Sequence, residues 1–262
     1  MRHLVLSDAH GDIRALQSVE KIAMSPTVGG FDDVWFLGDV FGRCNGNDVN
    51  NCLEWLHEHS AVCILGNHEW WVLTPELDPN NETTKLTTDQ RFRKRYWDEI
   101  VHYREWLKEN ENWYNYIKTW PDYLELGCVT LVHGSPLLCS VEGHMHCSTP
   151  YLEYNEQVEQ IFGTPKSICR VAPIIKTANL FVGHHHSPYV FYYRQNRGAR
   201  MPRDPLDKKK IQQFPLAIDG WRTAIRLGTV SPGALREKYP TACAMIYDDQ
   251  KNNITIFEVI YG

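Results

Sequence analysis

The feature that most constrains the fold is a series of short apolar runs, each ending in a motif rich in Gly, Asp or His. The runs are residues 3–6, 34–37, 62–65, 129–132 and 180–182. Short runs of β-branched and aliphatic residues are typical of buried strands. Sites in open α/β sheets form beyond the carboxyl ends of the strands. The sequence therefore predicts strands that deliver polar side chains to one edge.

The polar residues after these runs are of the types that bind divalent metal ions. They are Asp8, His10, Asp39, Asn67, His133, His184 and His186. Carboxylate, imidazole and amide ligands without a thiolate suit ions such as Mn, Fe, Zn, Ni or Co. Asp8 and His10 stand two apart, as do His184 and His186, so an extended backbone turns each pair to one side. Any one of these residues could be an ordinary turn or capping residue, but the ordered set favours a site.

The number of ligands indicates the chemistry. Seven ligands are too many for one tetrahedral zinc, but they suit two ions that share a bridging carboxylate. Two such ions clamp the attacking and leaving oxygens of a displacement at phosphorus, and a hydroxide between them is a nucleophile near neutral pH. With two carboxylates and one hydroxide, the centre keeps about one positive charge, which favours an anionic phosphoryl group.

A second Gly-His-x-His motif, Gly143 to His146, competes for the place of the last ligand pair. It follows a polar loop, whereas His184 and His186 follow an apolar run. We therefore interpret it as a solvated loop or part of the rim of the site.

The order of the motifs is similar to that of the calcineurin-like metallophosphoesterase superfamily. The matching motifs are Asp-x-His at 8–10, Gly-Asp at 38–39, Gly-Asn-His-Glu at 66–69, His-Gly at 133–134 and Gly-His-x-His at 183–186. Residues 228–233 and 241–248 look like the family's closing Gly-Ser segment and final hairpin. The stretch from Gly38 to Glu69, with His133-Gly134-Ser135-Pro136, looks closest to the small prokaryotic phosphodiesterase branch.

This resemblance implies a role for each site residue. One ion would be held by Asp8, His10, Asp39 and His186, and the other by Asp39, Asn67, His133 and His184, with Asp39 bridging. His68 would be the general acid at the leaving oxygen, although it could instead orient a group that touches the substrate. Asn67 would also contact the substrate, and Arg43 would either bind the phosphate or lie on the surface.

Two departures from the family argue against a protein phosphatase. The Ser/Thr phosphatase branch has Gly-Asp-x-x-Asp-Arg-Gly, in which the second Asp orients the catalytic His, but this chain has Gly42 there. The same branch has His-Gly-Gly where this chain has His133-Gly134-Ser135.

Length and composition predict one domain, residues 1–262, because 43% of its residues are hydrophobic and α/β folds of this length are routinely single domains. A net charge of −5 disfavours a surface that coats nucleic acid, although residues 195–210 are basic. The chain has no basic-then-apolar leader and no run of about 18 apolar residues, and its eight cysteines form no Cys-x-x-Cys pair. We therefore expect a cytoplasmic protein with reduced thiols and no membrane association.

The expected architecture is an α/β sandwich of two facing mixed β-sheets flanked by helices (αββα), with the metal centre at the strand-end loops. Helices are expected at 12–24, with Asp12 as N-cap, at 48–57 and at 89–109. An aromatic-rich block at about 70–123 is expected to form a helical cap beside the site, and the chain closes with two strands around a turn at 249–253.

These features predict a phosphodiesterase acting on a small phosphate ester, with a metal-bridging hydroxide as nucleophile. One alternative is a phosphatase of nucleotides or dinucleoside polyphosphates. The other is a non-catalytic binding scaffold with the same fold, which loss of ligands would indicate.

Overall fold

The structure is a computed structural model of the 262-residue chain. It describes residues 1–42, 49–74, 90–134, 139–141, 144–146, 175–184, 186, 188–194, 198–200, 211–216, 221–231 and 241–260. Arg43 and most of the basic stretch at 195–210 lie outside these residues.

The first sheet has the strand order β11-β14-β13-β1-β2-β3. Its strands are β1 (Arg2–Leu6), β2 (Asp33–Phe36), β3 (Val62–Cys63), β11 (Ile211–Pro215), β13 (Thr241–Asp248) and β14 (Asn253–Ile260). The strands β1, β2 and β3 run parallel, whereas β13 pairs antiparallel with β1 and with β14. The predicted closing pair of strands is confirmed.

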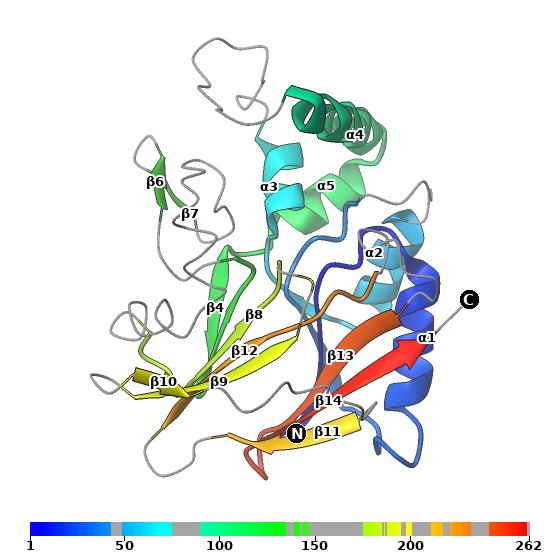
Figure 1. Ribbon diagram of the computed structural model, residues 1–262. Helices are drawn as coiled ribbons and strands as arrows, with labels where there is room; N and C mark the ends of the chain where they lie inside the picture. The colour runs from blue at the N-terminus through cyan, green and yellow to red at the C-terminus, as the bar shows by residue number, and fades with distance from the viewer. Residues whose placement is uncertain are drawn as a thin grey trace.

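The second sheet has the order β10-β9-β12-β8-β5-β4 and is also mixed. Its strands are β4 (Tyr123–Leu126), β5 (Val129–Val132), β8 (Asn179–Val182), β9 (Tyr189–Arg194), β10 (Gly198–Arg200) and β12 (Arg222–Arg226). A separate two-stranded ribbon joins β6 (Cys139–Val141) to β7 (His144–His146). The two larger sheets face each other (Figure 1).

Five helices are described: α1 (Ile13–Ala23), α2 (Val49–Glu58), α3 (Asn67–Leu73), α4 (Gln90–Glu109) and α5 (Glu111–Lys118). The helices α1 and α2 lie beside the first sheet, on the side away from the second (Figure 1). The side chain of Asp12 caps α1 by accepting a hydrogen bond from the Ala15 N–H at 3.1 Å, as predicted. The expected αββα sandwich is confirmed.

Strand β1 shows how the sequence builds this sandwich. Its side chains alternate between faces, as in any strand. Leu4 and Leu6 pack into the cluster beneath α1 and α2, whereas Val5 packs into the cluster between the sheets. Both faces are covered, so β1 is apolar from Leu4 to Leu6 instead of alternating with polar residues.

The described aromatic side chains of the block at 70–123 belong mainly to the core. Trp120 is buried in the cluster that includes Leu4 and Leu6, and Tyr103, Trp106 and Trp113 pack against that cluster. They join α4 and α5 to the first sheet, which favours a packing role for these rings over a base-stacking role.

Two further observations bear on the sequence analysis. Among the described residues, no helix combines the length and apolar character needed to cross a membrane. Cys52, Cys63, Cys128 and Cys243 carry free thiols.

The run at 62–65 is shorter as a strand than expected, because β3 includes only Val62 and Cys63. Helix α3 follows from Asn67, and no helix was predicted there. The motif Gly66-Asn67-His68-Glu69 therefore forms the first turn of a helix, so the directions of its side chains follow helical geometry and not that of an extended loop.

Candidate metal centre

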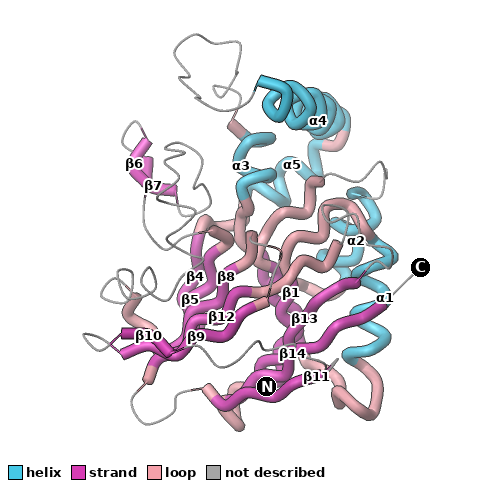
Figure 2. Tube along the Cα trace, in the orientation of Figure 1, coloured by secondary structure: helices cyan, strands magenta, loops and turns pink. Residues whose placement is uncertain are grey.

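All seven predicted ligands lie together at one end of the sandwich. Asp8 and His10 follow β1, Asp39 follows β2 and His133 follows β5. His184 and His186 follow β8, and Asn67 begins α3. The loops that carry them gather at the end of both sheets, below α3 and α5 (Figure 2). Three groups could each hold an ion, with ligand atoms within 4.8 Å of one another: Asp8, His10 and His186; His10, Asp39 and His68; and Asp39, His133 and His184.

The backbone at these residues is strained. Seven non-glycine residues in the described part have positive φ, and five of them are predicted ligands: Asp8 (58°), His10 (47°), Asp39 (62°), His184 (65°) and His186 (55°). A non-glycine residue in a sparsely populated region costs about 1–3 kcal/mol and persists where the surrounding structure enforces it. Such strain clusters at functional sites, so its concentration here favours a site over a set of ordinary turns.

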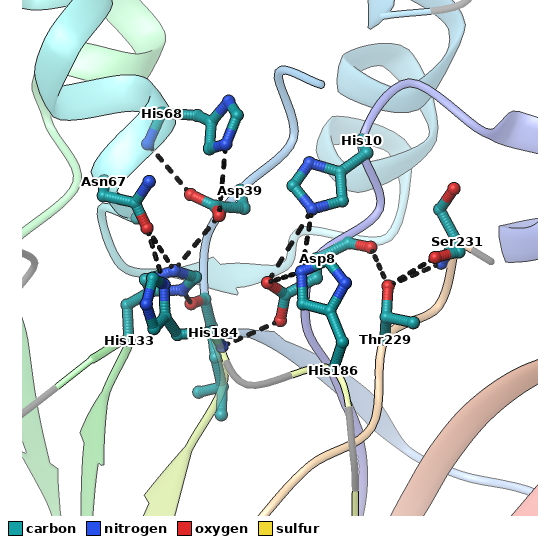
Figure 3. Close-up of polar contacts among 12 residues, drawn as sticks. Asp8, His10, Asp39, Asn67, His68, His133, His184, His186, Thr229 and Ser231 are labelled. Atoms are coloured by element: carbon teal, nitrogen blue, oxygen red, sulfur yellow. Dashed lines mark hydrogen bonds and ion pairs between the residues drawn. The ribbon is translucent and has the colours of Figure 1, made fainter. Parts of the chain in front are cut away.

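Asp8, His10 and His186 form the first group (Figure 3). The Phe41 carbonyl accepts a hydrogen bond from His10 Nδ1 at 2.9 Å, which directs Nε2 of the neutral ring, with its lone pair, into the site. That Nε2 lies 3.2 Å from Nε2 of His186, which is 3.1 Å from Oδ1 of Asp8. Burial lowers the pKa of His10 to about 4. Burial opposes ionisation of Asp8, but the neighbouring His186 outweighs it and holds the pKa of the carboxyl well below its usual range.

Asp39, Asn67, His133 and His184 form the second group. His133 donates from Nδ1 to the Leu37 carbonyl at 2.6 Å, and its Nε2 lies 3.2 Å from Oδ2 of Asp39 and 3.1 Å from Oδ1 of Asn67. The same Asn67 oxygen lies 2.8 Å from Nδ1 of His184. Burial lowers the pKa of His133, but the charge of Asp39 outweighs burial and raises it to about 10.

Asp39 connects the groups. It belongs to two of the three, and it is buried, with 2% of its surface exposed. Burial raises the pKa of this carboxyl, but the charges of His133 and His68 outweigh burial and hold it well below its usual value. A carboxylate that stays ionised between two groups of imidazoles has the position that a bridging ligand requires.

The donor set fits divalent cations. Imidazole nitrogens of His10 and His186 converge at 3.2 Å, a close approach that a shared cation between the two lone pairs would stabilise. Oδ1 of Asp8 is buried and makes no hydrogen bond among the described residues, although His186 lies near it. Carboxylates, imidazoles and one amide oxygen are the ligands expected for Mn, Fe, Zn, Ni or Co.

His68 belongs to the same cluster, but it contacts Asp39 through its backbone N–H more closely than through its ring. Its backbone N–H donates to Oδ1 of Asp39 at 3.0 Å, while its ring Nε2 is 3.9 Å from Oδ2. The ring also lies near the ring of His10, with centroids 5.0 Å apart. His68 therefore lies in the same cluster as the predicted ligands and forms one of the possible ion-holding groups with His10 and Asp39.

Two predicted features lie outside the described part of the chain. Arg43 lies outside the described residues, and so do the side chains of His144 and His146 in β7. The described groups that could hold an ion include His184 and His186.

Glu69 is a site residue that the sequence analysis quoted within a motif but gave no role. Its buried carboxylate accepts hydrogen bonds from the backbone N–H groups of Asp39, Val40, Phe41 and Gly66 at 2.7–3.2 Å. Burial and the charge of Asp39 raise the pKa of Glu69 to about 7, whereas the hydrogen bonds favour the ionised form. Glu69 ties the loop of Asp39 to the start of α3, which carries Asn67 and His68.

The segment around Thr229 supports the first motif. The N–H groups of Val230 and Ser231 donate to the carbonyls of Ser7 and Asp8 at 3.0 and 3.1 Å. The Thr229 hydroxyl also lies 2.9 Å from the Asp8 carbonyl (Figure 3). These contacts hold the backbone of Asp8 in its positive-φ conformation. The sequence feature that marks this segment is the closing motif at 228–233.

Glycine is required where the loops meet. A Cβ on Gly42 would lie 2.1–2.5 Å from Cα, Cβ and the carbonyl carbon of His10, and a Cβ on Gly66 would lie 2.2 Å from Oδ1 of Asp39. The backbone of His10 cannot move away without moving its ring. The orienting Asp of the protein phosphatase branch therefore does not fit at position 42 in this arrangement.

Comparison with known proteins identifies one family and several proteins of similar fold. The model of the calcineurin-like phosphoesterase family matches residues 1–223. An uncharacterised protein of Methanocaldococcus jannaschii is 24% identical over 258 residues, which cover 98% of this chain and 86% of that protein. In fold, the chain is similar to a metallophosphoesterase from Sphaerobacter thermophilus, with a TM-score of 0.61 and 23% identity over 100% of this chain and 90% of that one. It is also similar to a hypothetical protein from Pyrococcus horikoshii, with a TM-score of 0.56 and 18% identity over 100% and 88% of the two chains.

Proposed function

The chain belongs to the calcineurin-like phosphoesterase family, and we propose that it is a metal-dependent phosphodiesterase with a dinuclear centre. The observation that carries this proposal is the clustering of all seven predicted ligands at one end of the sandwich, with Asp39 in two of the three groups that could hold an ion. A binding scaffold that did not need metals would have no reason to keep five of these residues in positive-φ conformations.

In this proposal each ion takes ligands from both sheets. Asp8, His10, Asp39 and His186 would hold one ion, and Asp39, Asn67, His133 and His184 the other. When bound, the ions would activate water for attack at phosphorus and attract the phosphoryl oxygens. The carbonyls of Phe41 and Leu37 fix the rings of His10 and His133 so that Nε2 of each faces the site.

His68 is the proposed general acid. The ring lies beside Asp39 but is not among the ligands assigned to either ion, so it can give a proton to the leaving oxygen. Asn67, and Arg43 from outside the described residues, would contact the phosphoryl group. The helices around residues 70–123 would form a cap within a single domain.

A diester is proposed over a phosphoprotein because position 42 has no room for the carboxylate used by the protein phosphatase branch. The test is a comparison of bis-p-nitrophenyl phosphate with p-nitrophenyl phosphate, using enzyme loaded with Mn²⁺ or Co²⁺. We expect kcat/KM to be higher on the diester and activity to be nearly abolished in Asp39→Asn. Higher activity on the monoester would indicate a phosphatase instead, and equal activity of Asp39→Asn and wild type would refute metal catalysis at this site.

A further inference from the structure

Helix α4 contacts the end of α3 that lies away from the ligands. Arg104 is half-buried and donates three hydrogen bonds to carbonyls at the end of α3. Its Nη2 donates to Trp71 at 2.7 Å and to the C-cap residue Thr74 at 2.6 Å, and its Nε donates to Val72 at 3.3 Å. The last carbonyls of any helix lack partners within the helix. A guanidinium there also interacts favourably with the helix dipole. Arg104 therefore holds the end of a helix that is only seven residues long.

The held end of α3 is connected directly to His68. Trp71 stands three residues after His68, so the two side chains share one face of the helix. Their ring centroids are 5.2 Å apart, with the planes tilted by 47°. Arg104 fixes the carbonyl of Trp71, and the ring of Trp71 contacts the ring of His68, so the chain of contacts runs from α4 to the proposed acid.

A neighbouring residue of α4 reaches the other site loop. The Tyr103 hydroxyl donates to the Gly42 carbonyl at 3.3 Å, and its ring lies 4.9 Å from the ring of Phe41. The carbonyl of Phe41 orients His10. Two consecutive residues of α4 therefore contact the loop at residues 41–42 and the end of the helix that carries His68, so α4 supports the site from outside.

We propose that Arg104 is a positioning residue for His68, acting through the end of α3 and the ring of Trp71. This inference rests on the proposed function for its effect on rate. Its structural part, that Arg104 sets the orientation of the His68 ring, does not depend on any substrate. The other end of α3 is held independently by Glu69 and by the contacts of Asn67, so metal binding does not require Arg104.

The experiment compares Arg104→Met, which keeps an unbranched stem but removes the guanidinium, with Lys108→Met as the matched control. Lys108 lies on the same helix, its side chain is 71% exposed, and its ion pair with Glu105 is on the surface. Both variants are loaded with metal and their metal content is measured. Then kcat/KM is measured on an alkyl diester and on a nitrophenyl diester, whose leaving group needs little protonation.

We expect Arg104→Met to keep its metals and to lose roughly 10- to 100-fold on the alkyl ester, because a displacement of about 1 Å can cost about 10²-fold. The loss on the nitrophenyl ester should be smaller. In a His68→Ala background, Arg104→Met should cause no further loss, because the residue through which it acts is gone. Lys108→Met should match wild type in both backgrounds.

A second readout does not involve turnover. In the zinc-loaded protein with labelled histidine, the ring signal of His68 is identified by its absence in His68→Ala. The nearby ring current of Trp71 should make it shift in Arg104→Met and not in Lys108→Met. If the wild type hydrolyses neither ester, the proposed function fails, and this signal alone decides the role of Arg104.

Arg104→Lys, which retains the charge and can still reach a carbonyl, is a second variant that keeps the test decisive if Arg104→Met does not fold. It should fold and fall between wild type and the Met variant in both the alkyl-ester rate and the His68 signal. The proposal is overturned if the His68 signal stays in place in both variants. It is also overturned if the rate loss is equal on the two esters or persists undiminished in the His68→Ala background.

Discussion

At the scale of single residues, the chain assembles its site by combining strained backbone with a few buried polar contacts. Asp8, Asp39 and His184 adopt positive φ, and hydrogen bonds from elsewhere hold the loops in place. Glu69 makes the largest contribution of this kind, because one carboxylate accepts four backbone N–H groups from two loops.

Replacing Glu69 with Gln should separate those loops. The amide NH₂ of Gln cannot accept a hydrogen bond, so N–H groups that now face one carboxylate oxygen would lose their partner, at about 1–3 kcal/mol for each buried group. We expect a lower midpoint of urea unfolding and weaker metal binding. Glu54→Gln is the control, since Glu54 lies on the exposed side of α2. An unchanged midpoint and metal affinity in Glu69→Gln would show that this carboxylate is dispensable.

The role of His68 can be tested through the leaving group. General acid catalysis contributes typically about 10²–10⁴-fold, and it matters most when the leaving alkoxide is poor. His68→Ala should keep both metals and lose more kcat/KM on alkyl than on nitrophenyl esters. An equal loss on both would mean that His68 positions the substrate or the nucleophile, and unchanged rates would remove it from the mechanism.

At the scale of elements, local patterns predicted about half of the described strands (β1, β2, β3, β5, β8, β13 and β14) and three of the five described helices (α1, α2 and α4). An apolar run such as residues 3–6 identifies β1, and Asp12 followed by apolar residues at helical spacing identifies α1. Helix α3 was missed because its first turn coincides with the motif at 66–69, whose residues read as a loop. Tertiary contacts stabilise this helix. Glu69, in its first turn, accepts hydrogen bonds from the loop of Asp39, and Arg104 donates to the carbonyl of Trp71 near its end. Both the loop of Asp39 and Arg104 are far from α3 in sequence.

The two Gly-His-x-His motifs lie on different elements, so variants can distinguish them. His184 follows β8 of the second sheet, whereas His144 begins β7 of the separate ribbon. His184→Ala should empty one metal site, because Nδ1 of His184 lies 2.8 Å from Asn67 in the second group. His144→Ala should leave the metal content intact. If only His144→Ala lowers the metal content, the ligand pair has been assigned to the wrong motif.

At the scale of the whole molecule, the site depends on how the two sheets are placed. Asp8 and Asp39 come from the first sheet, whereas His133 and His184 come from the second. The sequence predicted which residues meet, since all follow strands, and the resemblance predicted how they are divided between ions. The sequence could not predict the order of the strands or the close contacts at the glycines, because both arise between segments that are far apart in the chain. Gly42, for example, is a plain departure from a motif in the sequence, but in the fold it is a position with no room for a side chain.

The most direct test of this account is the number of metal ions per chain. The purified protein is stripped with a chelator, loaded with Mn²⁺ or Co²⁺, freed of excess ion and measured by elemental analysis, with diesterase activity followed in parallel. The account predicts a value approaching two in the wild type, with activity rising as the metal is added. In Asp39→Asn both ions should bind more weakly, because the shared carboxylate is lost. A reproducible value of one or less in a fully active wild-type enzyme would contradict the dinuclear centre.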